Sequence, residues 1–464
     1  MLFHRIKRIH MMGIGGTGMS GMAEILLYHG FSISGCDSAE QEILDHLRDR
    51  GAVISIGHNP DHVIESDVVV YSSAVPTDHP ELAFARKSRI PTIKRAEMLG
   101  ELSRLHVTVA VSGTHGKTTT TSLIGFLADR LELDPTVIVG GRLISLPGHA
   151  RVGSGPMVIE ADEFDRSLRN IHPTLAVMTN VDRDHLDCYR DFADICETFL
   201  SYLQHVPFFG KVILNVDDSV QTSFLPQINR PVITYGTGGQ VDFKISEVEK
   251  TEEGTCFTCS VIPADQKYRV MIPLFGTHNV YNATAALAAL WDLTGSKDQL
   301  AGAVRFMKDF PGVSRRFESI GAIEGRPVIS DYAHHPREVQ AALEAAMQAF
   351  PGRPVIALFQ PHLYSRTRLF SHEFSKSLMV ADHVIVLPVY PAREEPIVGV
   401  TGESIVHGLR LEGHAGALFL PDVVSAVAKV KQSLPEDAIV LALGAGSIHI
   451  HLLRELGGVH AKKR

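Results

Sequence analysis

The chain has 464 residues, of which 45% are hydrophobic and 21% are charged, and its formal net charge at pH 7 is −8. This length suffices for two to four domains with separate cores, and the negative charge gives no support for a nucleic-acid partner. No stretch approaches the roughly 18 apolar residues of a membrane-spanning helix, and the basic N-terminus lacks the apolar run of a signal peptide. We therefore expect a cytoplasmic protein without a membrane or nucleic-acid partner.

Strands and helices are predicted to alternate through the first hundred residues, which indicates a parallel sheet. The expected strands are 9–12, 31–35 and 68–75, and the expected helices lie near 19–29, 40–50 and 80–88.

A glycine-rich loop follows the first strand. Gly13, Gly15 and Gly18 meet the G-x-G-x-x-G spacing, and Asp37 follows the second strand about 20 residues on. In a Rossmann arrangement the helix N-terminus binds a diphosphate and the acidic residue binds a ribose or base. The motif alone indicates a nucleotide diphosphate without specifying which one, and Asp37 could instead be a turn residue.

A second glycine turn joins an apolar strand to a helix that is expected to start at Leu123. Gly113 and Gly116 make this turn, and Lys117 and Thr118 follow it. The usual spacing G-x-x-x-x-G-K-[ST] would require glycine two residues before Gly113, where this chain has valine, so the loop is a shortened variant. In such a loop the backbone N–H groups face phosphate, the lysine reaches the β- and γ-phosphates, and the threonine hydroxyl binds Mg²⁺.

Two carboxylate clusters follow predicted strands in this segment. One contains Glu160 and three further acidic residues up to position 165, and the other is the D-x-D-H-L-D run at 182–187. Ligands bind at the carboxyl ends of strands in α/β sheets, and hard carboxylate oxygens suit Mg²⁺. For the second cluster, a polar surface turn is the alternative.

The stretch 231–270 is rich in alternating strands and is predicted to form a small satellite sheet. It includes Cys256 and Cys259, a lone C-x-x-C pair for which metal or redox chemistry is disfavoured, and the five scattered cysteines argue against a disulfide framework. The run G-x-H-N-x-x-N then precedes an alanine-rich helix, and helix capping is the alternative function for Asn279.

Three further motifs lie after position 311. Arg315 and Arg316 form a cation pair, of which we favour Arg316 as the phosphate ligand, although the sequence does not separate them. A strand ends at D-Y-A-H-H-P, whose two histidines could also be a surface pair. A later strand runs into His362 and Arg366, and guanidinium groups bind carboxylates and phosphates bidentately.

Taken together, the motifs resemble those of the Mur ligases, the ATP-dependent amino-acid ligases that build the peptidoglycan peptide. The motifs that carry the resemblance are G-I-G-G-T-G-M-S-G-M-A-E, V-V-Y-S-S-A-V-P, K-R-A-E-M-L, G-T-H-G-K-T-T-T-T, E-A-D-E-x-D, N-x-x-x-D-H-x-D, G-x-H-N-x-x-N and D-Y-x-H-H-P-x-E. The resemblance implies three α/β domains: a Rossmann-like UDP-sugar domain at 1–105, a central P-loop-type ATPase domain at 106–311, and a Rossmann-like domain at 312–464 that closes on ATP and the amino acid.

The resemblance also implies site residues. Those for the UDP-sugar are Gly13, Gly15, Gly16, Gly18, Asp37 and Ser73. Those for ATP are Gly113, Thr114, His115, Gly116, Lys117, Thr118, Thr119, His278, Asn279, Asn282, Arg316 and Asp331. Those for the amino acid are Tyr332, His334, His362 and Arg366, those for metal are Thr118, Glu160 and His185, and the catalytic set is Lys117, His185, His334 and Arg366.

Departures from the pattern point to one branch of the family. Many relatives carry a carbamoylated lysine about a dozen residues after the position of His185, whereas this chain has no lysine until Lys211. The alanine-adding branch of the family also lacks this lysine, so its absence favours that branch. Whether a second metal site is occupied stays an open question. Leu363 replaces an arginine and Ser447 an asparagine of some relatives.

The resemblance implies ATP and Mg²⁺ as cofactors, and UDP-N-acetylmuramate and L-alanine as substrates that are joined through an acyl phosphate. His185, His334 and a phosphate oxygen are all candidate acceptors for the amine proton. A recycling ligase that attaches a whole tripeptide to the same sugar nucleotide is the nearer alternative. A nicotinamide-dependent oxidoreductase, suggested only by the first glycine loop, is the more distant one.

Overall fold

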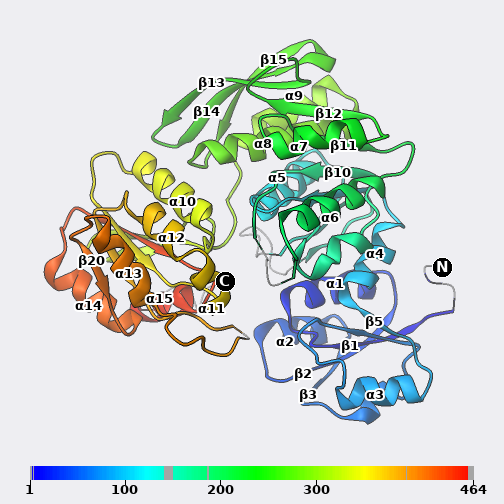
Figure 1. Cartoon of the computed structure of the whole chain (residues 1–464). Coiled ribbons are helices and arrows are strands. Elements are labelled where there is room, and N and C mark those ends of the chain that lie inside the picture. Colours follow the sequence, from blue (N-terminus) through cyan, green and yellow to red (C-terminus); the bar gives the residue numbers. More distant parts are fainter. Residues whose placement is uncertain (1–2, 4, 141–149, 185–187, 393, 458–464) are drawn as a thin grey trace. The chain divides into compact units, whose positions relative to one another are not determined.

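The computed structural model describes the chain except for residues 1–2, 4, 141–149, 185–187, 393 and 458–464. The described residues form three β-sheets of five, ten and six strands, with helices between the strands (Figure 1). The predicted three-domain α/β fold is therefore confirmed.

The first sheet has the strand order β3-β2-β1-β4-β5 and is parallel throughout. Its central strand is buried at four of its five residues, as expected for a strand covered on both faces. The strands are β1 (Arg8–Met12), β2 (Ser32–Asp37), β3 (Val53–Ile56), β4 (Val68–Tyr71) and β5 (Thr92–Lys94), and the helices are α1 (Thr17–Tyr28), α2 (Glu42–Asp49), η1 (Pro60–Val63), α3 (Pro80–Lys87) and α4 (Arg95–Ser103).

The second sheet has the order β15-β14-β13-β12-β11-β10-β6-β9-β7-β8. Its strands are β6 (Thr108–Ser112), β7 (Thr136–Ile138), β8 (Ala150–Arg151), β9 (Met157–Glu160), β10 (Leu175–Met178), β11 (Lys211–Asn215), β12 (Val232–Gly236), β13 (Phe243–Thr251), β14 (Gly254–Val261) and β15 (Gln266–Ile272). Its helices are α5 (Lys117–Arg130), η2 (Phe164–Asn170), α6 (Phe192–Gln204), α7 (Ser219–Phe224), η3 (Leu225–Gln227), η4 (Ile262–Ala264), α8 (Thr277–Thr294) and α9 (Lys297–Met307).

The prediction of a separate satellite sheet is wrong. β12 and β13 pair in parallel at Tyr235–Phe243 and Gly236–Lys244, so the later strands extend the central sheet. The sequence does not indicate this short pairing, because apolar and polar residues alternate along these strands as they would in an independent hairpin.

Two helices begin earlier than the sequence predicts. α5 begins at Lys117, not at Leu123, because Gly116 adopts φ +80° at its N-cap and the following threonines are buried within the helix. α8 begins at Thr277, so His278, Asn279 and Asn282 lie in its first turns instead of preceding it. The β-branched and polar residues of both starts disguise the helices.

The third sheet has the order β16-β17-β21-β18-β19-β20, parallel except for the β16–β17 pair. Its strands are β16 (Glu318–Ile323), β17 (Arg326–Asp331), β18 (Val355–Phe359), β19 (His383–Val386), β20 (Ala417–Phe419) and β21 (Ile439–Leu443). Its helices are α10 (Pro336–Ala349), α11 (Tyr364–Leu369), α12 (Ser371–Leu378), α13 (Gly402–Leu411), α14 (Val423–Ser433) and α15 (Ile448–Glu455).

The chain divides into two compact units. One comprises residues 1–247, 258–270 and 281–310, and the other comprises 248–257, 271–280 and 311–464. In the first unit a single hydrophobic cluster includes residues that surround both sheets. Leu99 and Leu102 of α4 belong to it together with Leu168 of η2. The first two sheets therefore share a core.

Among the described residues, no helix combines the length and hydrophobicity required to cross a bilayer. All five cysteines are free thiols, and the burial of β14 alternates so that Cys256 and Cys259 point to opposite faces of the strand. This orientation prevents them from acting as a chelating pair.

Candidate active site

The phosphate loop follows β6, an interior strand of the central sheet. β6 is hydrogen-bonded to β9 on one side and to β10 on the other, and both pairs are parallel. The carboxyl ends of the three strands therefore meet, which brings the loop after β6 beside Glu160 and beside the turn after β10.

Both glycines of the loop are required by its geometry. Gly113 has φ +126°, and a Cβ there would collide with the hydroxyl of Thr179. Gly116 has φ +80°, and a Cβ there would lie 2.5 Å from Oδ1 of Asn282. Asn282, in the second turn of α8, therefore lies against the start of α5.

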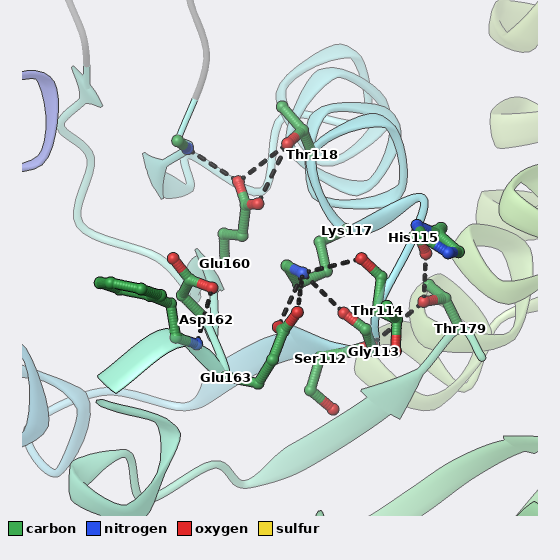
Figure 2. Close-up of polar contacts among 12 residues, drawn as sticks. Ser112, Gly113, Thr114, His115, Lys117, Thr118, Glu160, Asp162, Glu163 and Thr179 are labelled. Atoms are coloured by element: carbon green, nitrogen blue, oxygen red, sulfur yellow. Dashed lines mark hydrogen bonds and ion pairs between the residues drawn. The ribbon is translucent and has the colours of Figure 1, made fainter. Parts of the chain in front are cut away.

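Lys117 points into this loop (Figure 2). Its Nζ donates to the carbonyl oxygens of Gly113 at 2.7 Å and Thr114 at 3.1 Å, and lies 2.7 Å from Oε2 of Glu163. Burial alone would lower the pKa of Lys117, but the carboxylates of Glu163, Asp162 and Glu160 raise it above the ordinary value. The side chain is therefore a permanent cation in the loop.

Thr118 and Glu160 form a second pair on the other side of Lys117 (Figure 2). The hydroxyl of Thr118 donates to the carboxylate at 3.0 Å from Oε1, and the N–H of Gly140 donates to Oε2 at 2.8 Å. A hydroxyl and a carboxylate at this spacing are hard oxygen donors of the kind that Mg²⁺ prefers.

The turn after β10 is hydrogen-bonded to the backbone and side chains of the loop. Asn180 accepts from the N–H of His115 at 2.8 Å, and its own amide donates to the carbonyl of His115 at 2.9 Å. The N–H of Asp182 in turn donates to the hydroxyl of Thr114 at 2.8 Å.

Thr119 is buried in the first turn of α5. His185, predicted as a metal ligand and catalytic residue, lies outside the described residues.

The other two predicted residues of α8 lie in the second compact unit. His278 is exposed, and Asn279 is buried and donates its amide to the carbonyl of Phe275 at 2.7 Å. This bond to the preceding turn fixes the orientation of the Asn279 amide.

The N-terminal glycine loop is tied to Asp37. The carboxylate of Asp37 accepts from the N–H of Gly15 at 2.8 Å, and the N–H of Gly13 donates to the carbonyl of Cys36 at 2.8 Å. Gly16 is the N-cap of α1, and a Cβ on Gly18 would lie 3.0 Å from the guanidinium of Arg95. Ser73 is exposed in the turn after β4. The loop, a helix N-terminus and a guanidinium group together form an anion-binding arrangement.

In the C-terminal sheet, Asp331 ends β17 and accepts from the N–H groups of Phe317 and Ala333, both at 2.8 Å. Burial raises the pKa of Asp331 to about 6, against the opposing charge of Arg316. Arg315 donates to the carbonyls of Gly444 at 2.8 Å and Gly446 at 3.2 Å, so its guanidinium is engaged in holding the end of β21.

An aromatic and imidazole cluster adjoins Asp331. Tyr332 lies 5.2 Å from the ring of His334, which lies 5.9 Å from the ring of His362, and His362 stacks on Tyr390. Leu363 follows with φ +67°, a backbone conformation that costs energy for a branched residue and is common at functional sites. Arg366 is buried in α11. The four predicted amino-acid ligands thus follow the carboxyl ends of β17 and β18, the two strands that flank β21 in this sheet.

The sequence prediction missed three residues that the geometry places at these sites. Glu163 pairs with Lys117, Asn180 holds the loop backbone at His115, and Arg95 contacts the N-terminal glycine loop. Each belongs to a motif already noted, but only the folded chain shows which member of the motif points inward.

Comparisons with known proteins agree along the whole chain. Residues 8–106 match the profile "Mur ligase family, catalytic domain", residues 111–290 match "Mur ligase middle domain", and residues 315–446 match "Mur ligase, glutamate ligase domain". The UDP-N-acetylmuramate–L-alanine ligase of Salinibacter ruber is 42% identical over 462 residues, covering 98% of this chain and 96% of that protein. The enzyme of the same name from Halorhodospira halophila is also 42% identical over 462 residues, covering 98% and 94%.

Solved structures show the same fold. The UDP-N-acetylmuramate–alanine ligase of Thermotoga maritima superposes with a TM-score of 0.79 at 28% identity, covering 99% of this chain and 100% of that one. The murein peptide ligase of Psychrobacter arcticus gives 0.71 at 23% identity, covering 98% and 99%. The sequence relationship over nearly the full length decides the matter: the chain belongs to the Mur ligase family.

Proposed function

We propose that this protein is an ATP-dependent ligase that joins L-alanine to the carboxylate of UDP-N-acetylmuramate in peptidoglycan precursor synthesis. A carboxylate oxygen of the sugar attacks the γ-phosphorus of ATP and ADP departs, giving an acyl phosphate. The nitrogen of L-alanine then attacks the carbonyl carbon and phosphate departs, leaving the amide. The observation that carries the proposal is Lys117 held inside a glycine loop beside the Thr118–Glu160 pair.

The central domain is assigned to ATP. Backbone N–H groups at the N-terminus of α5 are assigned to the phosphates, and Lys117 neutralises the charge that develops on the transferred group. Thr118 and Glu160 would hold Mg²⁺, which supplies charge neutralisation at the phosphates. His185 stays a predicted ligand of a second ion.

The other two domains are assigned to the substrates to be joined. Residues 1–105 bind UDP-N-acetylmuramate through the Gly13–Gly18 loop, with Asp37 orienting that loop through Gly15. Residues 312–464 supply Arg316 and Asp331 for ATP, and Tyr332, His334, His362 and Arg366 for the amino acid. The boundaries near 105 and 311 remain predictions, as does the cytoplasmic location.

Arg316 is preferred to Arg315 on structural grounds. Both guanidinium groups lie over the ring of Tyr332. The Arg315 guanidinium already donates to two carbonyls, whereas the side chain of Arg316 makes no hydrogen bond or ion pair within the described part of the chain. A guanidinium group without such hydrogen bonds can bind a phosphate. Nδ1 of His334 lies 3.0 Å from the carbonyl oxygen of Tyr332, which accepts its proton, and 3.4 Å from Oε2 of Glu338.

The test is phosphate release from ATP in the presence of Mg²⁺ and UDP-N-acetylmuramate, with L-alanine or the tripeptide L-Ala-γ-D-Glu-diaminopimelate as acceptor. Release that depends on L-alanine supports the proposal. Release with the tripeptide alone would assign the protein to the recycling ligases. Release with neither, together with quenching of nicotinamide fluorescence on titration, would support the oxidoreductase alternative.

A further inference from the structure

A group of imidazole, thiol and carboxylate side chains lies in the N-terminal domain on the face of the sheet that α3 and η1 cover. It comprises His10 of β1, Cys36 of β2, His58 in the loop after β3, His62 of η1 and Glu81 of α3. Nothing in the ligase reaction requires this group. His10, Cys36 and Glu81 are each at most 1% exposed, although a hydrophobic core would be expected at these positions.

Three of the potential donor atoms form a nearly equilateral triangle. Sγ of Cys36 lies 3.3 Å from Nδ1 of His58 and 3.3 Å from Oε2 of Glu81, and Nδ1 of His58 lies 3.4 Å from Oε2 of Glu81. Tetrahedral zinc with bonds of 2.0–2.3 Å separates neighbouring ligand atoms by about 3.3–3.8 Å. The triangle therefore has the dimensions of one face of such a tetrahedron.

His10 of β1 offers a further donor. His10, Cys36 and Glu81 each offer a ligand atom within 4.8 Å of the other two, and His58, His79 and Glu81 form a second such group that shares Glu81. Nδ1 of His10 lies 2.9 Å from the hydroxyl of Ser34, while Nε2 is buried and has no hydrogen-bond partner among the described residues. A hydrogen bond on one imidazole nitrogen with the other left for a metal is the usual arrangement of a histidine ligand.

We propose that His10, Cys36, His58 and Glu81 bind a divalent d-block cation of borderline softness, with Zn²⁺ as the best match. One thiolate, two imidazoles and one carboxylate suit zinc, whereas Mg²⁺ prefers oxygen ligands only. His58 is the exposed member of the group and provides the entry path. His62, whose Nδ1 lies 3.1 Å from Oε1 of Glu81, orients the carboxylate.

The site adjoins the glycine loop through the backbone. The carbonyl of Cys36 accepts from the N–H groups of Gly13 and Ile14, and the next residue, Asp37, holds Gly15. A metal bound at Cys36 would therefore immobilise the end of β2 on which this loop rests. The expected effect is a higher melting temperature of the loaded protein.

The experiment is a Co²⁺ titration of the full-length protein after treatment with a chelator and desalting, in a buffer with excess Mg²⁺ to saturate oxygen-rich sites. We expect one tightly bound Co²⁺ with a thiolate-to-cobalt charge-transfer band and intense d–d bands of tetrahedral geometry, both abolished by one equivalent of Zn²⁺. Cys36→Ser should abolish the charge-transfer band, and His58→Gln should weaken binding at least about tenfold. Cys256→Ser, a half-buried thiol in another sheet, is the matched control and should leave both bands intact.

His58→Gln keeps the experiment decisive if the buried variant fails to fold, because His58 is exposed. Absence of a charge-transfer band in the wild-type protein would overturn the proposal and leave a buried hydrogen-bond network around Glu81. Loss of the band in Cys256→Ser but not in Cys36→Ser would overturn it equally, by moving the metal to another thiol.

Discussion

Lys117 and Glu163 form a buried ion pair inside the phosphate loop, with Nζ 2.7 Å from Oε2 and side chains that are 11% and 3% exposed. Without a nucleotide, the carboxylate balances the charge that the loop holds for phosphate. Removing one partner of a buried pair leaves an uncompensated charge and typically costs about 3–5 kcal/mol. Glu163 therefore contributes to the stability of the folded protein, whereas Lys117 is needed for both stability and catalysis.

Lys117→Met should reduce the rate of phosphate release at least about 100-fold, because a phosphate ligand is lost. It should also lower the free energy of unfolding, since Glu163 is left buried without its cation. The double variant Lys117→Met/Glu163→Gln should regain most of the stability and none of the activity. Urea unfolding and phosphate release, measured on the same preparations, check this, and a double variant as unstable as the single one would contradict it.

Thr118→Val should raise the Mg²⁺ concentration needed for half-maximal activity, roughly 10–100-fold, while Thr118→Ser should stay near wild type. The valine keeps the volume but removes the hydroxyl that bonds Glu160 at 3.0 Å. Mg²⁺ titrations of the initial rate distinguish the variants. Equal Mg²⁺ requirements in both would show that the hydroxyl is no metal ligand.

Arg315→Ala and Arg316→Ala should separate a structural from a catalytic arginine. Loss of Arg315 leaves the carbonyls of Gly444 and Gly446 without their donor, so we expect a stability loss of about 1–3 kcal/mol. Loss of Arg316 should leave the melting temperature unchanged and lower kcat about 100-fold or more. The reverse pattern would assign the phosphate contact to Arg315.

Asp331 predicts a pH dependence of stability. Its folded pKa of about 6 lies above the model-compound value of 3.8, so the folded protein binds the proton more tightly than the unfolded chain between those pH values. This carboxyl therefore makes the free energy of unfolding fall as the pH rises from 4 to 6. The difference between wild type and Asp331→Asn, measured by urea unfolding across this range, should show that slope, and parallel curves would refute it.

The fold and the chemical class could be predicted from the sequence because both depend on local patterns. Apolar runs end at glycines or carboxylates, and parallel strands bring such ends together; the family resemblance then implied that Thr118 and Glu160 share a metal site. The sequence does not indicate the start of α5, because a run of threonines has low helix propensity and burial against the sheet overrides that preference.

The pairings that complete the site could not be predicted. Which of four clustered carboxylates turns toward Lys117 depends on the backbone after β9, where Glu163 points inward and Glu160 faces Thr118. The roles of Arg315 and Arg316 likewise depend on a positive φ at Arg315, which no periodicity reveals.

The hydrophobic core common to the first two sheets has a thermodynamic consequence. Leu99 and Leu102 pack in one cluster with Leu168, and Gly100 lies so close to the carbonyl of Asn170 that any side chain would collide. Residues 1–105 could not melt without exposing part of the ATP-binding segment to water, so the two should unfold in one calorimetric transition, distinct from that of the C-terminal sheet with its own cores. By linkage, any ligand held at the N-terminal glycine loop would raise the temperature at which the distant phosphate loop is lost.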